Sequence, residues 1–298
     1  MEGTKVALLV ERRHLKNKAI VGAREMLEGA GCFVPLVIPE EGGLFDVPEK
    51  APGWDAVLSR GRDLAGLGLL AAASALGVLA VNHPQSIELV RNKIAMQAVL
   101  HQHDLPLPRT WFAADAAVFR EVPPERYPLV VKPYDGDGSR GISLLSNADD
   151  VEELPQLSGR SSLYLAQEFL DNDGWDLKLY GIGSKVWAVR KPSPVSFQGS
   201  GPAIVTSPKG SEPVALDAEL RDIALTCGRA CGLELWGVDV AVTPCGPRVI
   251  EVNDFPTYSA VPEAGEEIAR HVLTRIEMES VVREAGRDGL SATVRDLP

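Results

Sequence analysis

The first 82 residues alternate between short apolar runs and longer segments with helical spacing. The apolar runs are 5–10, 33–39, 54–61 and 78–82, and the helical segments are 17–31 and 64–77. Strands separated by helices form a parallel sheet, because a parallel neighbour requires a long right-handed crossover. The sequence therefore predicts a small parallel α/β domain over residues 1–84.

After about residue 111 strand-like segments joined by turns replace this alternation, which predicts an α+β fold for the rest of the chain. The predicted strands are 127–133, 141–145, 161–170, 175–183, 185–191, 235–243 and 247–253, and the predicted helices are 147–154, 217–232 and 266–282. A stretch rich in Ser, Pro and Gly at 192–213 predicts a mobile loop.

Composition excludes several classes of protein. The formal net charge is −11, which argues against a nucleic-acid partner. No run of apolar residues is long enough to span a membrane, and the N-terminus has no signal-peptide pattern, so we expect a cytoplasmic protein. Four cysteines are too few and too scattered for a disulfide framework, and we expect Cys227 and Cys231, four residues apart on a predicted helix, to act as small buried hydrophobic residues.

The segment "PLVVKPYDGDGSRGISLL" (128–145) places Lys132 on a strand before a glycine-rich loop. Glycine lets backbone N–H groups approach a ligand closely, so the loop could fold over phosphates while Lys132 supplies a charge. The segment is not a Walker A motif and not a dinucleotide fingerprint, because "GK[ST]" is absent and a strand follows the loop. An ordinary hairpin turn is the alternative interpretation.

The segment "WGVDVAVTPCGPRVIEVND" predicts a hairpin that carries Asp239, Glu251 and Asn253. With 243–247 as the connection, residue 242 pairs with 248, and Asp239 then lies opposite Glu251. The apolar residues expected to point the other way are Val238, Val240, Ile250 and Val252. Two opposed carboxylates are destabilising unless a cation lies between them, and oxygen ligands of this kind suit Mg²⁺. The alternative is a solvated polar sheet face.

The segment "AQEFLDNDGWDLKLY" places Glu168 and Phe169 at the end of one strand and Asp176 at the start of the next. Backbone groups at a strand end can pair with an adenine edge, and a carboxylate a few residues later can accept hydrogen bonds from a ribose. An ordinary strand–turn–strand is the alternative interpretation.

With Lys93 in "VRNKIAMQAVL" preceding them, these motifs follow the order of the ATP-grasp fold over roughly residues 80–272. The chain resembles the RimK-like carboxylate–amine ligases most. The resemblance implies an N-terminal domain of residues 1–84, a central subdomain of 85–170 with the lid loop, and a C-terminal subdomain of 171–298 with the metal site. It also implies ATP as cosubstrate and one or two Mg²⁺ ions, for which Mn²⁺ could substitute.

The resemblance also assigns roles to residues of this sequence. Lys93 and Lys132 would hold ATP phosphates, Glu168 and Phe169 the adenine, and Asp176 the ribose. Asp239, Glu251 and Asn253 would hold the metal. Arg190 would face the reacting phosphate and act with Lys132 in catalysis. The remaining nucleotide-site residues would be Asp135, Gly136, Gly138, Ser139, Gly141, Gln167 and Leu170.

The implied reaction is formation of an amide between an amine and a carboxylate that ATP activates as an acyl phosphate, with amino-acid or peptide-like substrates. Two departures concern the acceptor: "SFQGSG" lacks a second arginine of these ligases, and "VRKPSPVSF" (189–197) is similar to a run in inositol trisphosphate 5/6-kinases. An ATP-grasp kinase that phosphorylates an inositol-type hydroxyl is therefore the alternative. The family further suggests a homo-oligomer.

Overall fold

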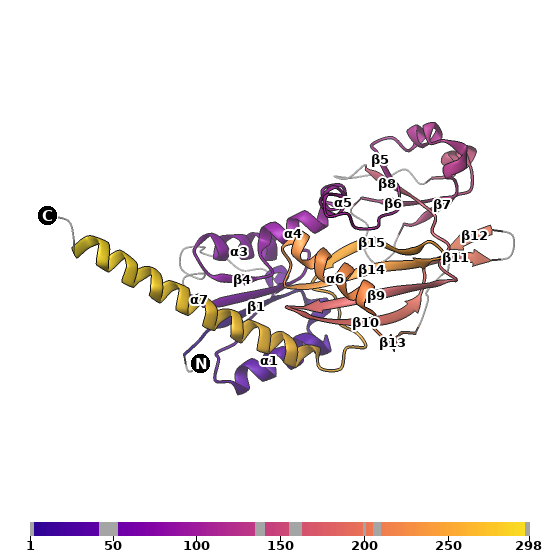
Figure 1. Cartoon of the computed structure of the whole chain (residues 1–298). Coiled ribbons are helices and arrows are strands. Elements are labelled where there is room, and N and C mark those ends of the chain that lie inside the picture. Colours follow the sequence, from indigo (N-terminus) through magenta and orange to yellow (C-terminus); the bar gives the residue numbers. More distant parts are fainter. Residues whose placement is uncertain are drawn as a thin grey trace. The chain divides into compact units, whose positions relative to one another are not determined.

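The computed structural model describes residues 3–41, 53–134, 141–154, 163–198, 201–204 and 210–295. It divides into two compact units, one of Met1–Gln85 with Thr257–Pro298 and one of Ser86–Pro256 (Figure 1). The last helix thus belongs to the same unit as the N-terminal sheet, while the finer division of the chain into three parts stays a prediction. Among the described helices, none combines the length and apolar character needed to cross a bilayer.

The first unit contains a parallel sheet with the strand order β2-β1-β3-β4. Its strands are β1 (Val6–Val10), β2 (Leu36–Val37), β3 (Ala56–Arg60) and β4 (Leu79–Val81). Every residue of β1 and β3 is buried, as expected for parallel strands that are covered on both faces. The predicted strand 33–39 is shorter in the structure, because β2 is an edge strand of two residues and Phe33 forms only an isolated bridge to Lys5.

Side-chain caps begin the helices of the first unit. Asn17 accepts hydrogen bonds from the first turn of α1 (Lys18–Gly29), and Asp63 does the same for α3 (Leu64–Ala75). The helix predicted at 266–282 is longer in the structure, as α7 (Ala264–Arg295), and it packs against α1 (Figure 1). The short 3-10 helices η1 (Arg12–His14) and η2 (Pro39–Glu41) complete this unit.

The second unit begins with α4 (Pro84–Arg91) and α5 (Lys93–Gln102) and contains a four-stranded antiparallel sheet in the order β5-β8-β6-β7. The strands are β5 (Thr110–Ala113), β6 (Leu129–Pro133), β7 (Ser143–Leu145) and β8 (Tyr164–Glu168). The 3-10 helices are η4 (Ala116–Glu121), η5 (Pro124–Arg126) and η6 (Ala148–Glu153). Phe119 of η4 and Val151 of η6 pack on the face of the sheet that carries Val131 and Ala166. Since side chains alternate along a strand, Lys132 and Gln167 lie on the other face.

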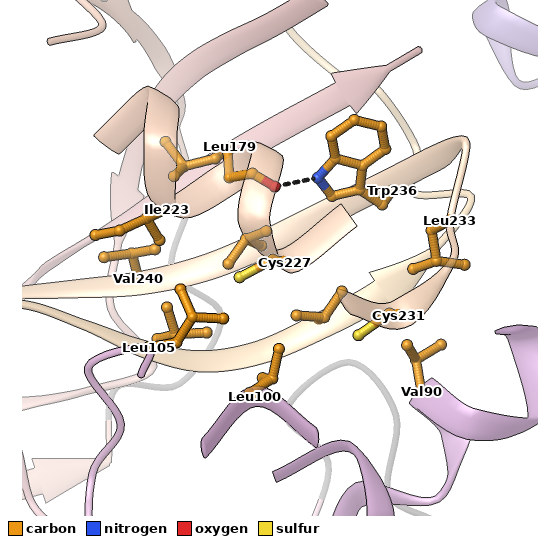
Figure 2. Close-up of a cluster of buried hydrophobic side chains, with 14 of the residues drawn as sticks. Val90, Leu100, Leu105, Leu179, Ile223, Cys227, Cys231, Leu233, Trp236 and Val240 are labelled. Atoms are coloured by element: carbon orange, nitrogen blue, oxygen red, sulfur yellow. Dashed lines mark hydrogen bonds between the residues drawn. The ribbon is translucent and has the colours of Figure 1, made fainter. Parts of the chain in front are cut away.

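The second sheet of this unit has five antiparallel strands in the order β13-β10-β9-β14-β15. They are β9 (Trp175–Ile182), β10 (Lys185–Pro192), β13 (Glu212–Val214), β14 (Leu235–Thr243) and β15 (Gly246–Asp254). Helices α5 and α6 (Ala218–Cys231) cover one face and form the core around Trp236, whose Nε1 donates to Ala224 O at 3.0 Å (Figure 2). The opposite face therefore remains for polar side chains.

The segment 192–213 is not simply a loop. β11 (Val195–Gln198) and β12 (Gly201–Ile204) form an antiparallel hairpin, and β12 lies beside β7 of the four-stranded sheet. The prediction of a loop was wrong for these strands, because Ser, Pro and Gly mark turns but do not exclude short strands between them.

Candidate active site

Asp239 of β14 lies directly opposite Glu251 of β15, and Asn253 lies opposite Gly237 on the same face. The predicted opposition of Asp239 and Glu251 is present, although the turn differs from the one expected. Thr243 pairs with Gly246, so the connection is only Pro244 and Cys245.

A β-bulge corrects the register in the middle of this hairpin. Val242 pairs with Pro247 and not with residue 248, and the pairing shifts by one residue between Asp239 and Val240. Ile250 is the extra residue of this bulge and has no partner on β14. Val249 therefore packs in the core at the position predicted for Ile250. Without the bulge the short turn would have set Asp239 opposite Ile250.

Two lysines and an amide surround the carboxylate of Asp239. Lys178 Nζ donates to Oδ2 at 2.9 Å, Asn253 Nδ2 donates to the same oxygen at 3.0 Å, and Lys191 Nζ lies 3.3 Å from Oδ1. Burial alone would raise the pKa of Asp239, but Lys178 and Lys191 outweigh it and lower the pKa to about 2. Although burial disfavours a charged amine, Asp239 raises the pKa of Lys178, so both partners are ionised at neutral pH.

Glu251 has its own lysine. Lys93, the first residue of α5, is buried and donates to Glu251 Oε1. Lys132 lies in the same electrostatic environment: burial lowers its pKa, Lys93 acts in the same direction, and Glu251 and Asp239 oppose both. Lys132 comes from the four-stranded sheet, so one site joins residues of both sheets of the second unit.

The formal charge of this site is opposite in sign to the net charge of the whole chain. The lysines are Lys93, Lys132, Lys178 and Lys191, and the carboxylates near them are Asp176, Asp239 and Glu251. Four lysines against three carboxylates give a formal excess of one positive charge at this site, in a chain with a net charge of −11. Such a site attracts a polyanion such as a triphosphate.

The donor set fits a hard divalent cation. Asp239 Oδ1 is buried and has Lys191 Nζ as an ion-pair partner at 3.3 Å, and Asn253 uses its amide nitrogen toward Asp239, which leaves its amide oxygen for a ligand. Among the described residues no three or more His, Cys, Asp or Glu side chains gather as in an all-protein metal cage. Mg²⁺ is commonly held by one or two carboxylates and completed by substrate phosphates, which matches these residues.

The residues predicted to bind adenine lie at the end of β8. Glu168 Oε1 accepts from Arg109 N at 3.0 Å, and Phe169 N donates to Pro128 O at 2.9 Å, so these two groups already have partners. Phe169 and Leu170 are partly exposed, whereas Gln167 is buried and donates to Thr110 Oγ1 at 3.1 Å. Their contact with adenine stays a prediction.

Asp176, predicted to bind ribose, is the most enclosed carboxylate of the group. It is 5% exposed and accepts hydrogen bonds from Asn172 Nδ2 at 2.5 Å and from Ser193. Burial and the nearby charge of Asp239 raise the pKa of Asp176 to about 6, although Lys191 and the two hydrogen bonds act against this. The structure therefore surrounds this carboxylate with protein donors.

Arg190 and Lys191 are neighbours on β10 and lie on opposite faces of the sheet. Arg190 pairs with Leu177, whose side chain packs on the core beneath α6, whereas Lys191 points toward Asp239. The arginine predicted to face the phosphate is thus on the face away from Asp239.

The glycine-rich loop lies mostly outside the described residues, including Asp135, Gly136, Gly138 and Ser139. Gly141 at its end has φ +72°, and an added Cβ would lie 3.0 Å from Pro133 Cγ. Glycine is therefore required where the loop rejoins β7.

Lys178 and Lys191 were missed from the sequence. A usable signal was present, because Asp176 and Lys178 alternate along β9, and a hairpin through "GS" places Lys191 opposite Asp176. Following that alternation across to β14 would have placed both lysines on the face of Asp239.

Comparisons with known proteins identify the family of this chain. The model of the RimK-like ATP-grasp domain matches residues 90–276. A probable alpha-L-glutamate ligase of Thioalkalivibrio sulfidiphilus is 30% identical over 283 residues, which cover 91% of this chain and 92% of that protein. Another, from Vibrio parahaemolyticus, is 27% identical and covers 77% of this chain and 78% of its own length.

Solved structures show the same fold. D-cycloserine synthetase DcsG aligns with a TM-score of 0.73 at 19% identity and covers 91% of this chain and 99% of its own. A RimK domain ATP-grasp protein of Sphaerobacter thermophilus aligns with a TM-score of 0.68 at 24% identity, covering 91% and 100% of the two chains.

Proposed function

Because this chain belongs to the RimK-like ATP-grasp family of ATP-dependent ligases, we propose that it joins an amine to a carboxylate through an acyl phosphate. The amine would be an α-amino acid such as glutamate, since the curated relatives are named probable alpha-L-glutamate ligases. The carboxylate would belong to an amino acid or peptide. A cytoplasmic location and a homo-oligomer stay predictions.

The observation that carries this proposal is the convergence of four lysines on the Asp239–Glu251 pair. In the first step, a substrate carboxylate oxygen bonds to the γ-phosphorus as the bond to the bridging oxygen of ADP breaks. In the second, the amine nitrogen bonds to the acyl carbon, phosphate leaves, and the nitrogen loses a proton. Neither step requires a nucleophile from the protein, so positioning and charge neutralisation are its contribution.

Five residues of the site would bind the nucleotide and the metal in this reaction. Lys93 and Lys132 would hold the phosphates of ATP, and Asp239, Glu251 and Asn253 would hold Mg²⁺, or Mn²⁺ in its place. Bound magnesium would neutralise charge on the phosphate oxygens. The solved ATP-grasp ligase PsnB, which is 18% identical with a TM-score of 0.64, contains Mg and ADP together.

Hydroxylamine trapping would test the acyl phosphate directly. The protein is incubated with ATP, MgCl₂, glutamate and a pool of amino acids and small peptides, with and without hydroxylamine. We expect ADP release that depends on a carboxylate substrate, and a hydroxamate of that substrate in the trapped reaction. A phosphorylated alcohol from an inositol pool, with no hydroxamate, would overturn the ligase in favour of the kinase.

A further inference from the structure

We propose that Lys191, and not Arg190, is the residue of β10 that contacts the γ-phosphoryl group of ATP. This inference rests on the proposed function, because it concerns the nucleotide of that same site. It replaces the role predicted for Arg190 with one that follows from the register of the sheet.

The register separates the two side chains. Arg190 pairs with Leu177, and Leu177 pairs with Val240, which is fully buried beneath α6. Directly paired residues of an antiparallel sheet project from the same face, so Arg190 lies on the α6 side. Lys191 is one residue farther along β10 and therefore lies on the other face, with Asp176 as its partner on β9.

Arg190 already has partners on its own face. Its guanidinium pairs with Glu212, the residue opposite on edge strand β13, with Nε at 2.9 Å from Oε1. Its Cζ also lies 4.4 Å from the ring centroid of Trp175. A carboxylate and an aromatic ring thus contact this arginine on its own face, at the solvent-exposed edge of the sheet.

Lys191 lies where a phosphoryl group would be received. Its Nζ forms an ion pair with Oδ1 of Asp239 at 3.3 Å, and this oxygen is buried. Its side chain is 37% exposed, against 14% for Lys178, so it is the more accessible of the two ammonium groups beside Asp239. If Asp239 holds Mg²⁺ together with a phosphate of ATP, this ammonium would lie beside that phosphate and could neutralise its charge.

Nucleotide affinity separates the two residues without any acid or amine substrate. We would measure the dissociation constants of the non-hydrolysable ATP analogue AMPPNP and of ADP by calorimetry in MgCl₂. The variants are Lys191→Gln, Lys191→Arg, Arg190→Gln and, as a matched control on the same strand, Lys185→Gln, whose residue is exposed at the far end of β10. Circular dichroism would check that each variant is folded.

Lys191→Gln is expected to weaken AMPPNP binding roughly tenfold to a hundredfold, as for loss of one charge-assisted contact, and to change ADP binding less than about threefold. Lys191→Arg should restore most of the AMPPNP affinity, and Arg190→Gln and Lys185→Gln should leave the ratio of the two constants unchanged. If Arg190→Gln instead weakened AMPPNP binding more than ADP binding, or Lys191→Gln weakened the binding of both nucleotides equally, the inference alone would fail. Wild-type protein that bound neither nucleotide would overturn the proposed function with it.

Discussion

Asp239 and Glu251 oppose each other across the β14–β15 hairpin, and each carboxylate is bound by a different lysine, Lys178 and Lys93. Like charges in directly opposed positions destabilise a sheet unless cations compensate them. The lysines come from β9 and from the start of α5, so two other elements of the second unit make this pair possible. A site that concentrates opposite charges in this way is arranged for a charged ligand and not for sheet stability.

Replacing Glu251 by Gln should abolish ADP release, by at least about a hundredfold, because a neutral amide is a poor ligand for Mg²⁺. The protein should remain folded, with a loss of stability of about 3 kcal/mol, since the buried ammonium of Lys93 would lose the charge of its partner but keep an amide oxygen as acceptor. The measurements are coupled-assay ADP release and urea unfolding.

Glu212→Gln is the matched control, because Glu212 also pairs with a cation in the same sheet but on the face away from Asp239. It should retain wild-type turnover. If turnover survived in Glu251→Gln, or fell equally in both variants, the metal-ligand assignment would be wrong.

Much of the fold could be predicted, because hydrophobic periodicity indicates the helices and strands and the order of the motifs indicates the family. The parallel N-terminal sheet, the antiparallel sheets that follow and the ATP-grasp family are confirmed. The opposition of Asp239 and Glu251 was predicted through two errors that cancel: the turn is shorter than assumed, and a bulge at Ile250 compensates. A bulge adds one residue without a clear sequence signal, so register beyond it cannot be counted from the turn.

The two faces of β10 show where motif matching is ambiguous. Arg190 was selected by likeness to a family arginine, yet its neighbour Lys191 is the residue near Asp239. A shift of one residue in an alignment exchanges the two faces of a strand, so a charged pair such as Arg190–Lys191 is ambiguous until the register is known. The adenine and lid residues remain predictions for a different reason, because backbone contacts leave little trace in side-chain identity.

Gly181 should tolerate no side chain. It lies opposite Trp236 on β14, and an added Cβ would lie 2.1 Å from Cε2 of the buried indole (Figure 2 shows Trp236 in its core). Gly181→Ala should therefore destabilise the protein by at least about 3 kcal/mol, since neither the sheet nor the packed ring can move away.

Gly68→Ala is the contrasting variant, because Gly68 is exposed in the middle of α3 and no atom lies within 4 Å of the added Cβ. It should stabilise the protein by about 0.5–1 kcal/mol. Urea unfolding that gave both variants the same sign would contradict the packing described for Trp236.

The four cysteines should differ sharply in reactivity. Cys32, Cys227 and Cys231 are buried and Cys245 is exposed in the β14–β15 turn. Burial raises the pKa of all three buried thiols, that of Cys231 to about 12, so they carry almost no thiolate at neutral pH. Ellman's reagent should titrate one thiol in the native protein and four in guanidinium, and Cys245→Ser should remove the native reaction. Rapid labelling of a second native thiol would show that the core around α6 opens more readily than its packing indicates.

Asp176 should make the protein less stable as the pH rises. Its pKa is about 6 in the folded chain against an ordinary value of 3.8, so between these values the unfolded state has lost a proton that the folded state still binds. The free energy of unfolding should then fall between about pH 4 and pH 6, by up to about 3 kcal/mol from this group.

Asp176→Asn keeps a carbonyl oxygen for the hydrogen bond from Asn172 and removes the charge. The variant should match the wild type near pH 4 and exceed its stability by about 1–3 kcal/mol at pH 8. Asp239 does not obscure this comparison, because the pKa of Asp239 is lowered to about 2 and its stabilising contribution is lost only in acid below pH 4. Urea unfolding of both proteins at one-unit pH steps measures the difference, and a difference that stayed constant from pH 4.5 to pH 8 would mean that Asp176 is ionised in the folded protein at every pH tested.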